Sequence, residues 1–420
     1  MSTSYTDTGN IQATQPASAA RSPMAAVLTS RPYQLLWTAQ FASLLAGFFN
    51  YIAVSWLTLQ LTGSTIAVGV VLAAASIPMA VLMLGSGVAS DRFTPRATMM
   101  AAGLIRAVVV AIVATLALLG VIQLWELIAA AVVVGATTAF FIPAGQAMLP
   151  RVVPGEQLQA ANALLNLSRT GAMVLGSAAA GVVVAAVGAG TALAVDAAAS
   201  LLAALVLLPL PAGDRVARVA GESAFTQIRE GIAYVWQDVP LRVTLIAIAV
   251  LNLAALGAIE VGLPALAFQR FGQSSGVLGA TFAAWGIGST IGAIGAGTRQ
   301  APSRVGRFLL VTVVLTGAGI GAIGVAPTLP ILVAVMVANG VVEGAATTVL
   351  ITWLQRRTAP ELQGRVMSLA MFASTGLEPL ALAGAGAIAA SGLGLLFWGA
   401  TGIIEGTAAG AALSRSIRQL

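Results

Sequence analysis

The stretch 85-GSGVASDRFTPRATMM-100 places three charged residues, Asp91, Arg92 and Arg96, between two long apolar segments. Only 8% of the 420 residues are charged, and 58% are hydrophobic. A soluble domain of this size needs roughly a quarter of its residues charged. The composition, with a mean hydropathy of +0.95, therefore predicts a membrane protein in which this charge cluster connects two spans.

The residue types that are missing exclude most catalytic chemistry. The chain has no His and no Cys, and all 20 of its basic residues are Arg. Disulfides, His or Cys metal sites, thiol nucleophiles and His general bases are thus excluded. We expect neither an enzyme nor a bound cofactor or metal. The net charge of +6 comes from Arg residues scattered singly among apolar runs, which indicates membrane orientation and not nucleic-acid binding.

Apolar segments long enough to cross about 30 Å of hydrocarbon follow one another from Pro32 onward. Residues 1–31 are polar and lack the apolar core of a signal peptide, so we predict a disordered tail there. We predict twelve transmembrane helices, at approximately residues 32–60, 64–90, 96–119, 124–149, 156–187, 189–210, 240–269, 274–298, 304–325, 328–355, 360–390 and 393–414.

The distribution of Arg predicts the orientation of these spans, because cytoplasmic loops of membrane proteins collect positive charge. Arg residues precede the first span and follow the even-numbered ones, and among the opposite connections Arg270 is the exception. Both termini are therefore predicted to be cytoplasmic. We expect a multi-pass protein of the bacterial cytoplasmic (inner) membrane.

One longer polar piece, residues 211–239, separates six spans from six. It begins Gly- and charge-rich and then carries apolar residues at helical spacing: Phe225, Ile228, Ile232 and Trp236. This spacing predicts an amphipathic helix at the cytoplasmic membrane surface, with Ser223 as its N-cap. The predicted domains are the tail, an N-terminal bundle at 32–210, this linker, and a C-terminal bundle with a short cytoplasmic tail at 240–420.

The two halves are related in sequence. Several residues in the first two spans of each half match at an offset of 210, for example Gly47 with Gly257 and Gly69 with Gly279. A single offset that also aligns the loops indicates internal duplication, which is typical of transporters that rock two bundles around a central site. The predicted fold class is an all-α membrane protein with twelve transmembrane helices in two pseudo-symmetric six-helix bundles.

The opening stretch resembles the signature loop of the major facilitator superfamily, which lies between that family's second and third spans. The matching positions are Gly87, Asp91, Arg92 and Arg96. The resemblance implies that Asp91 accepts hydrogen bonds from Arg96 and from the amino end of the eleventh span, and that Gly87 lets the second and eleventh helices approach closely. The cluster would then latch the bundles in the outward-facing state. The alternative is that Arg92 and Arg96 only hold the loop in the cytoplasm.

Two further connections extend this resemblance. Residues 140–164 and 358–369 are similar to the fourth-to-fifth and tenth-to-eleventh connections of the exporter branch, which includes macrolide, multidrug and enterobactin-type siderophore efflux proteins. The resemblance covers residues 32–415 and implies the major facilitator fold and an efflux function. The equivalent loop of the second half contains no acid, so we expect a latch on one side only.

Charged residues inside the spans are the candidate functional groups, because each is costly in hydrocarbon unless it faces a cavity or a partner. In the family's architecture the third, sixth, ninth and twelfth helices stand outside the cavity. We therefore interpret Arg106, Asp196 and Glu405 on those helices as structural. The cavity candidates that remain are Glu260, Glu343, Glu378 and Arg169.

Glu260 lies 210 residues after Asn50, so the repeat places an acid and an amide at equivalent depth on the seventh and first helices. Family members often carry an acid in the first span and an Arg in the fourth, and both are missing here. We expect Glu260 or Glu378 to couple transport to protons, with protonation and substrate binding excluding one another. Pro379 supports Glu378, because a Pro inside a helix frees carbonyl groups that can line a cavity. The alternative is a buried acid satisfied by a neighbouring helix.

These observations predict a secondary exporter that works by alternating access as an antiporter. The proton gradient would drive a small apolar or amphipathic molecule out of the cell, as in multidrug resistance. A highly charged substrate is disfavoured, although Arg169 leaves a siderophore-like monoanion open. The alternatives are an importer, a lipid or metabolite flippase of the same fold, or a non-transporting membrane sensor. We expect a monomer in the lipid bilayer whose partners are its substrate and protons.

Overall fold

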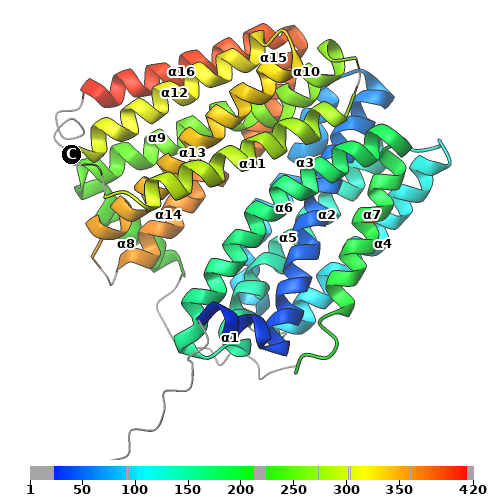
Figure 1. Ribbon diagram of the computed structural model, residues 1–420, viewed down its shortest axis with the longest axis horizontal. Coiled ribbons are helices and arrows are strands. Elements are labelled where there is room, and N and C mark those ends of the chain that lie inside the picture. Colours follow the sequence, from blue (N-terminus) through cyan, green and yellow to red (C-terminus); the bar gives the residue numbers. More distant parts are fainter. Residues whose placement is uncertain are drawn as a thin grey trace, which may run out of the picture.

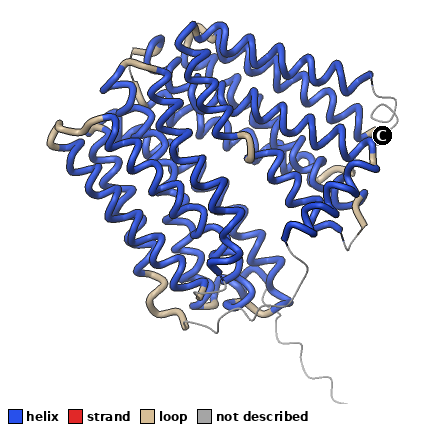
Figure 2. The backbone as a smooth tube through the Cα atoms, turned by 180° about the vertical axis from the view of Figure 1, so that it is seen from behind, coloured by secondary structure: helices blue, strands red, loops and turns tan. Residues whose placement is uncertain are grey.

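The protein is helical throughout the part that the structure describes. The structure, a computed structural model, describes residues 23–90, 94–211, 224–272, 274–300, 302, 304–359 and 362–413, and for residues 23, 84–90, 224–228 and 231 it describes the backbone alone. Every regular element in these ranges is a helix (Figure 2). The all-α prediction is thereby confirmed for this part of the chain.

In the described part of the chain, the N-terminal bundle contains six long helices, which Figure 1 labels α2 to α7. In this bundle α4 packs against α5 and α7, and α2 packs against α6 and α7. The six helices are α2 (Arg31–Thr62), α3 (Thr65–Ser90), α4 (Pro95–Leu118), α5 (Leu124–Val152), α6 (Leu158–Val187) and α7 (Ala189–Leu205).

The C-terminal bundle differs from the first in that two of its helical paths are interrupted. Between α9 and α10 the chain makes one π-helical turn, Ala258–Gly262, and between α14 and α15 it breaks at Gly376 and Leu377. The helices are α9 (Val239–Gly257), α10 (Leu263–Arg270), α11 (Gly276–Gly297), α12 (Val305–Val325), α13 (Leu329–Arg357), α14 (Gln363–Thr375), α15 (Glu378–Ser391) and α16 (Leu393–Leu413).

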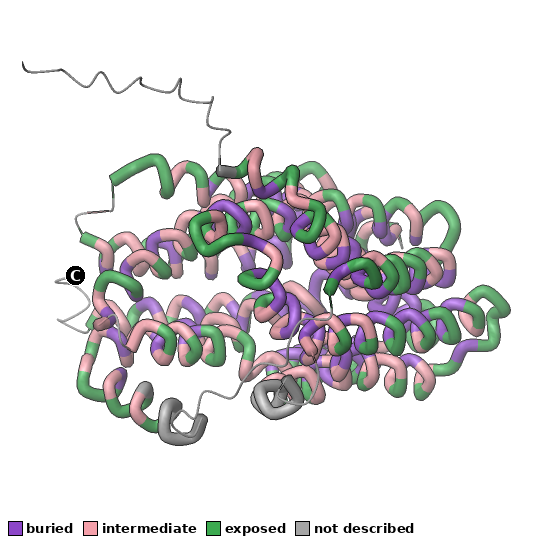
Figure 3. Tube along the Cα trace, turned by 90° about the horizontal axis from the view of Figure 1, so that it is seen from below, coloured by how far each residue is buried: buried purple, intermediate pink, exposed green. Residues whose placement is uncertain are grey.

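Within the described residues, ten helical paths are long and apolar enough to cross a membrane. The helix α7 is apolar but has only 17 residues, and α16 is not among the ten. Large apolar side chains cover the outer surface, for example Val81, Leu175 and Leu380, and Figure 3 shows buried residues concentrated between the helices. The chain is a multi-pass membrane protein, whereas the count of twelve spans stays a prediction.

The end of the predicted disordered tail is ordered, which corrects that prediction for residues 23–29. These residues form the short helix α1 (Pro23–Thr29), in which Val27 is fully buried against the N-terminal bundle. The side-chain amide of Gln34 also donates a hydrogen bond to the Leu28 carbonyl at 2.6 Å. Sequence composition missed this helix because contacts with the rest of the bundle hold it, and composition does not show such contacts.

The linker contains the predicted helix, α8 (Ala224–Gln237), which packs against α9 and α14. Val235 is buried with Leu241 of the C-terminal bundle, whereas Ile232 and Trp236 are exposed. Apolar side chains exposed beside the end of a bundle suit a helix at a membrane surface, and that placement stays a prediction. The predicted N-cap, Ser223, lies outside the described residues.

The two bundles meet closely at one end, where α3 packs against α15 and α6 against α11. A β-carbon added to Gly279 would lie 2.6 Å from the Ser177 carbonyl oxygen, and one added to Gly69 would lie 2.6 Å from that of Leu382. Gly279 also faces Gly181 across this contact, and Gly69 faces Gly386. These four glycines form what we call the glycine seam. In Figure 1 the bundles diverge from the seam toward the side that carries α1 and α8.

We predict that Gly279→Leu opens the glycine seam. Overpacking a tight contact costs about 1–3 kcal/mol, which shifts a two-state equilibrium by roughly 5- to 150-fold. Because the chain has no Cys, spin labels can be placed uniquely by Val187→Cys and Gln269→Cys, at exposed ends of α6 and α10. Electron paramagnetic resonance should then show longer distances between the labels.

The control for this prediction is Gly295→Leu, on the same helix α11, where an added β-carbon meets nothing within 4 Å. It should leave the label distances unchanged. Equal distances between the spin labels in the Gly279→Leu variant and in the labelled protein that keeps Gly279 would contradict the prediction.

Candidate functional site

Two cavities lie on either side of the junction between the bundles. The first, of about 630 Å³, is lined mainly by α2, α4, α5 and α7, and we call it the N-side cavity. The second, of about 740 Å³, is lined by α9 and α11 to α14, and we call it the C-side cavity. Glu260 and Trp285 line both cavities. Each volume lies in the range of small-molecule binding sites.

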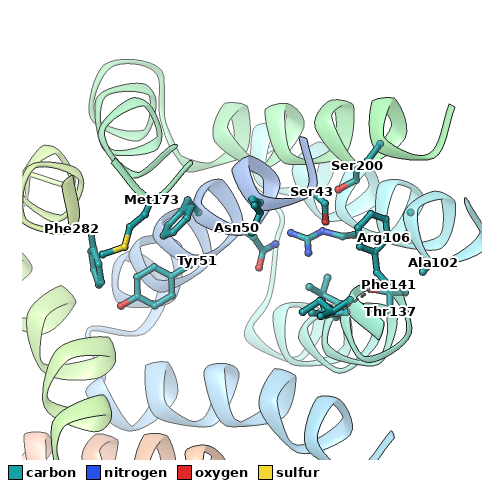
Figure 4. Close-up of a pocket in the computed structure, with 18 of the residues that line it drawn as sticks. Ser43, Asn50, Tyr51, Ala102, Arg106, Thr137, Phe141, Met173, Ser200 and Phe282 are labelled. Carbon is teal, nitrogen blue, oxygen red and sulfur yellow. Dashed lines mark hydrogen bonds between the residues drawn. The ribbon is translucent and has the colours of Figure 1, made fainter. Parts of the chain in front are cut away.

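The N-side cavity has a mixed wall of apolar and polar side chains. Figure 4 shows Asn50 and Arg106 directed toward one another, with Phe141 and Thr137 beside them and Met173 and Phe282 on the opposite side. Ser43 and Ser200 add hydroxyl groups to this wall. Such a surface suits an amphipathic molecule, because apolar area supplies binding energy and a few polar groups fix the orientation.

A buried ion pair forms part of the wall of the N-side cavity. The Arg106 guanidinium donates two hydrogen bonds to one oxygen of Asp196, at 3.1 and 3.2 Å, and Asp196 is fully buried. Asn50 donates to the other oxygen at 2.8 Å, and Ser200 donates to the first at 3.0 Å. This pairing agrees with the interpretation of Arg106 and Asp196 as residues with a structural role. However, Arg106 also lines the cavity, which the sequence had not indicated.

Glu260 lies at the junction of the bundles, on the π-helical turn Ala258–Gly262. Besides the two large cavities it lines a smaller one, of about 160 Å³, together with Asn50 and Glu378. The structure therefore brings together three of the predicted site residues, from α2, the π-helical turn and α15. A π-helical turn widens the backbone locally and occurs often at functional sites.

Glu378 is placed by the break between α14 and α15. It occupies the first turn of α15, directly after the break at Gly376 and Leu377. An acid is favourable there, because the amino end of a helix carries partial positive charge. Pro379 lies at the start of α15, where its missing N–H breaks no helical hydrogen bond. The expectation that Pro379 lies inside a helix and frees carbonyl groups is therefore wrong, and the interruption lies just before Glu378.

Tyr51 also lies at the junction of the bundles, although the charged residues of the spans gave no indication of it. Its hydroxyl donates a hydrogen bond to the Glu260 backbone carbonyl at 2.9 Å, which joins α2 of one bundle to the π-helical turn of the other. Its ring meets Phe282 edge to face, with centroids 5.3 Å apart. The only signal in the sequence was its position next to Asn50.

Glu343 lies on α13 in the wall of the C-side cavity. Ser289 of α11 donates a hydrogen bond to one of its oxygens at 2.7 Å, and Thr347 donates to the other at 3.2 Å. These bonds fix the carboxyl group within the C-terminal bundle. Among the described residues, no group of three or more Asp or Glu side chains is placed to hold a metal ion.

Arg169 is the predicted candidate that the structure does not bring to the cavities. It is exposed on α6 and does not line either the N-side or the C-side cavity. It precedes Met173, a lining residue, by one helical turn and therefore shares its helix face. Arg169 thus lies beyond the cavity along α6, in the direction away from the glycine seam.

The predicted latch can be followed only in part. Asp91 and Arg92 lie outside the described residues, and Gly87 belongs to the segment of α3 described by its backbone alone. Arg96 donates hydrogen bonds to the carbonyl groups of Leu207 and Leu208 at 2.9 and 2.6 Å, after the carboxyl end of α7. These partners belong to the same bundle, so the described contacts of Arg96 do not join the two bundles.

Comparisons with known proteins agree with this architecture. The family model described as Major Facilitator Superfamily matches residues 36–380. The multidrug efflux pump Tap of Mycolicibacterium fortuitum is 29% identical over 374 residues, covering 85% of this chain and 90% of Tap.

Solved structures of the nucleoside transporter NupG share the fold. A mutant form matches with a TM-score of 0.73 and 14% identity, covering 91% of this chain and 99% of NupG. A second NupG structure matches with a TM-score of 0.68 and 13% identity, covering 91% and 98%. At these identities the likeness concerns the fold alone.

We predict that Asp196→Ala strongly destabilises the protein, because it leaves the buried Arg106 charge without its partner. Removing one member of a buried pair costs about 3–5 kcal/mol. The double variant Arg106→Ala with Asp196→Ala should lose less than the single one. Thermal unfolding of the purified protein, followed by Trp fluorescence, measures both.

Arg357→Ala is the control, because Arg357 pairs with Asp238 at 2.9 Å in a partly exposed position. Such pairs contribute about 0–1 kcal/mol. An Asp196→Ala variant no less stable than Arg357→Ala would show that the buried pair has no structural role.

Proposed function

The chain belongs to the Major Facilitator Superfamily, and from this membership we propose that it is a secondary exporter that exchanges a small amphipathic molecule for protons. Membership makes the chain a membrane transporter and not an enzyme. The observation that carries the proposal is the position of Glu260, which lines both large cavities where the two bundles meet. A group there is accessible from whichever cavity the substrate occupies.

Export is supported by the similarity to the multidrug efflux pump Tap, which extends over 85% of this chain. The largely apolar wall of the N-side cavity also suits substrates of varied shape, because apolar contacts are not directional. We therefore propose that several drugs or drug-like molecules share this path.

Proton coupling is supported by the small cavity that Glu260 and Glu378 share. Among the residues that the structure describes, no basic side chain lines this cavity. Two carboxylates that line one small cavity repel one another when both are ionised, and here they lack a counter-charge. A proton or a cationic substrate therefore has to balance them, and the two would exclude one another. This competition is what an antiporter needs.

Alternating access is supported by the glycine seam. We propose that both termini are cytoplasmic and that the membrane is the bacterial cytoplasmic membrane, as the Arg distribution predicts. The divergence of the bundles toward α1 and α8 is then an inward-open state, with the seam closing the outer end.

The general test is a resistance and accumulation screen in a host that lacks its own efflux pumps. An exporter lowers the accumulation of its substrate and raises resistance. Greater accumulation would instead identify an importer, and movement of labelled lipid between leaflets would identify a flippase. A protein that binds and moves none of the compounds but associates with a partner protein would be the non-transporting sensor.

We predict that Glu260→Gln and Glu378→Gln impair coupling in proteoliposomes, using a substrate from that screen. At least one variant should reduce transport driven by a pH gradient by tenfold or more, because an amide cannot carry the proton. Exchange of labelled for unlabelled substrate needs no net proton movement and should persist. The measurement is flux with and without the pH gradient.

Glu405→Gln is the matched control, since Glu405 on α16 lines neither of the large cavities nor the small one. It should keep gradient-driven flux. If Glu260→Gln and Glu378→Gln both keep it as well, the coupling proposal fails.

We predict that Tyr51→Phe slows transport about 3- to 10-fold without changing substrate KM. It removes one hydrogen bond between the bundles, of about 0.5–1.5 kcal/mol, and leaves the ring in place against Phe282. Tyr33→Phe is the control, because the Tyr33 hydroxyl bonds to the Ala161 carbonyl at 3.1 Å within one bundle. Equal rates for both variants would refute a cross-bundle role for Tyr51.

A further inference from the structure

Among the described residues, the lining of the C-side cavity includes acids but no basic side chain. Its charged lining residues are Glu260 and Glu343, and its amides are Asn252 and Asn339. Hydroxyl groups complete the polar part of the wall, from Thr312, Thr316, Thr347, Ser368 and Ser374. This set of groups offers a substrate negative charge and hydrogen bonds, and no group that could pair with an anion.

Arg106 and Arg169 do not offset the negative charge of the cavity lining. Arg106 lines the N-side cavity, but its charge is matched by Asp196, which is fully buried beneath it. Arg169 is exposed on α6 and lines neither cavity. The combined lining of the two cavities therefore favours a cationic substrate by charge complementarity.

Glu343 differs from the other two acids in how it is held. Two hydroxyl donors, Ser289 and Thr347, bind its two oxygens, and both belong to the C-terminal bundle. Glu260 and Glu378 instead share the small cavity at the junction with the other bundle, beside Asn50. Glu343 is thus an anchored carboxyl within one bundle, whereas the other pair lies where the bundles move against one another.

Aromatic and thioether side chains surround the acids of the C-side cavity. Trp285, like Glu260, lines both this cavity and the N-side cavity, and Met367 and Met371 line it from α14. The face of an indole ring attracts cations, and methionine side chains adapt to varied apolar shapes. These residues would bind the apolar body of a molecule whose charge lies at Glu343.

We propose that the C-side cavity is a recognition site for monovalent organic cations with an apolar body, and that Glu343 determines the specificity for positive charge. The inference deepens the proposed function and rests on it only in assuming that this cavity lies on the transport path. Glu343 then selects the substrate, and because Glu260 lines the same cavity, the positive charge of the substrate still competes with a proton on Glu260 and Glu378. A siderophore-like anion, which Arg169 left open in the sequence, is disfavoured.

The test is equilibrium binding to the purified full-length protein, with two hydrophobic probe ions of matched shape and opposite charge. Radiolabelled tetraphenylphosphonium should bind saturably, and tetraphenylborate should not compete with it for the site. Glu343→Gln should weaken binding of tetraphenylphosphonium by tenfold or more. Glu405→Gln, an acid outside the cavities, should leave the affinity unchanged.

A second variant keeps the test decisive if Glu343→Gln fails to fold. Ser289→Ala combined with Thr347→Ala retains the carboxyl group but removes both donors that position it. It should weaken binding of tetraphenylphosphonium about 3- to 10-fold. Glu343→Asp, which retains the charge on a shorter side chain, should bind more tightly than Glu343→Gln.

Three outcomes would overturn the inference: unchanged affinity in Glu343→Gln, no saturable binding of tetraphenylphosphonium, or saturable binding of tetraphenylborate that Arg169→Gln abolishes. These results would leave proton-coupled export of another substrate intact. Conversely, binding that depends on Glu343 in a protein without gradient-driven flux would support the recognition site and refute the proposed function. The two failures are therefore distinguishable.

Discussion

The high free energy of an unpaired charge in hydrocarbon governs where the charged side chains of this protein lie. Asp196 and Arg106 meet that constraint by pairing, and Glu343 meets it through two hydroxyl donors. Arg270, the basic residue on the opposite side of the predicted membrane, donates to the Gly324 carbonyl at the carboxyl end of α12. Glu260 and Glu378 line a small cavity together, which is why we propose them as the acids that couple transport to protons.

The positions of these two acids depend on interruptions in the helices that carry them. Inside a continuous α-helix the backbone N–H and C=O groups form regular hydrogen bonds with one another. The π-helical turn at Glu260 and the break before Glu378 interrupt this regular pattern in the C-terminal bundle. Irregular backbone at membrane depth is tolerated where it lines a cavity. The two interruptions lie beside one another, so one region of the C-terminal bundle supplies both acids and the deformable backbone around them.

The helix α2 links this region to the other bundle through two consecutive residues. Asn50 donates to Asp196 within the N-terminal bundle, and Tyr51 donates to the Glu260 carbonyl across the junction. Farther toward the closed end, the glycine seam brings backbone against backbone, where no side chain can absorb a shift. The contacts between the bundles are thus concentrated at one end, where α3 packs against α15 and α6 against α11, as suits two bodies that move as units.

The sequence by itself determined the class, a multi-pass membrane protein, and singled out Glu260, Glu343 and Glu378 as candidate acids. Hydropathy, the distribution of Arg and the cost of a charge in hydrocarbon can all be evaluated without coordinates. It also located Asn50 and Glu260 at equivalent positions, which the structure brings to one cavity. The order in residues 23–29, the cavity-lining role of Arg106 and the bond from Tyr51 to Glu260 came only from tertiary structure. Each depends on contacts between segments far apart in the chain, and a pattern of local spacing carries no information about them. Arg169 shows the same limit, since a charge within a span does not reveal whether it faces a cavity or lies beyond it.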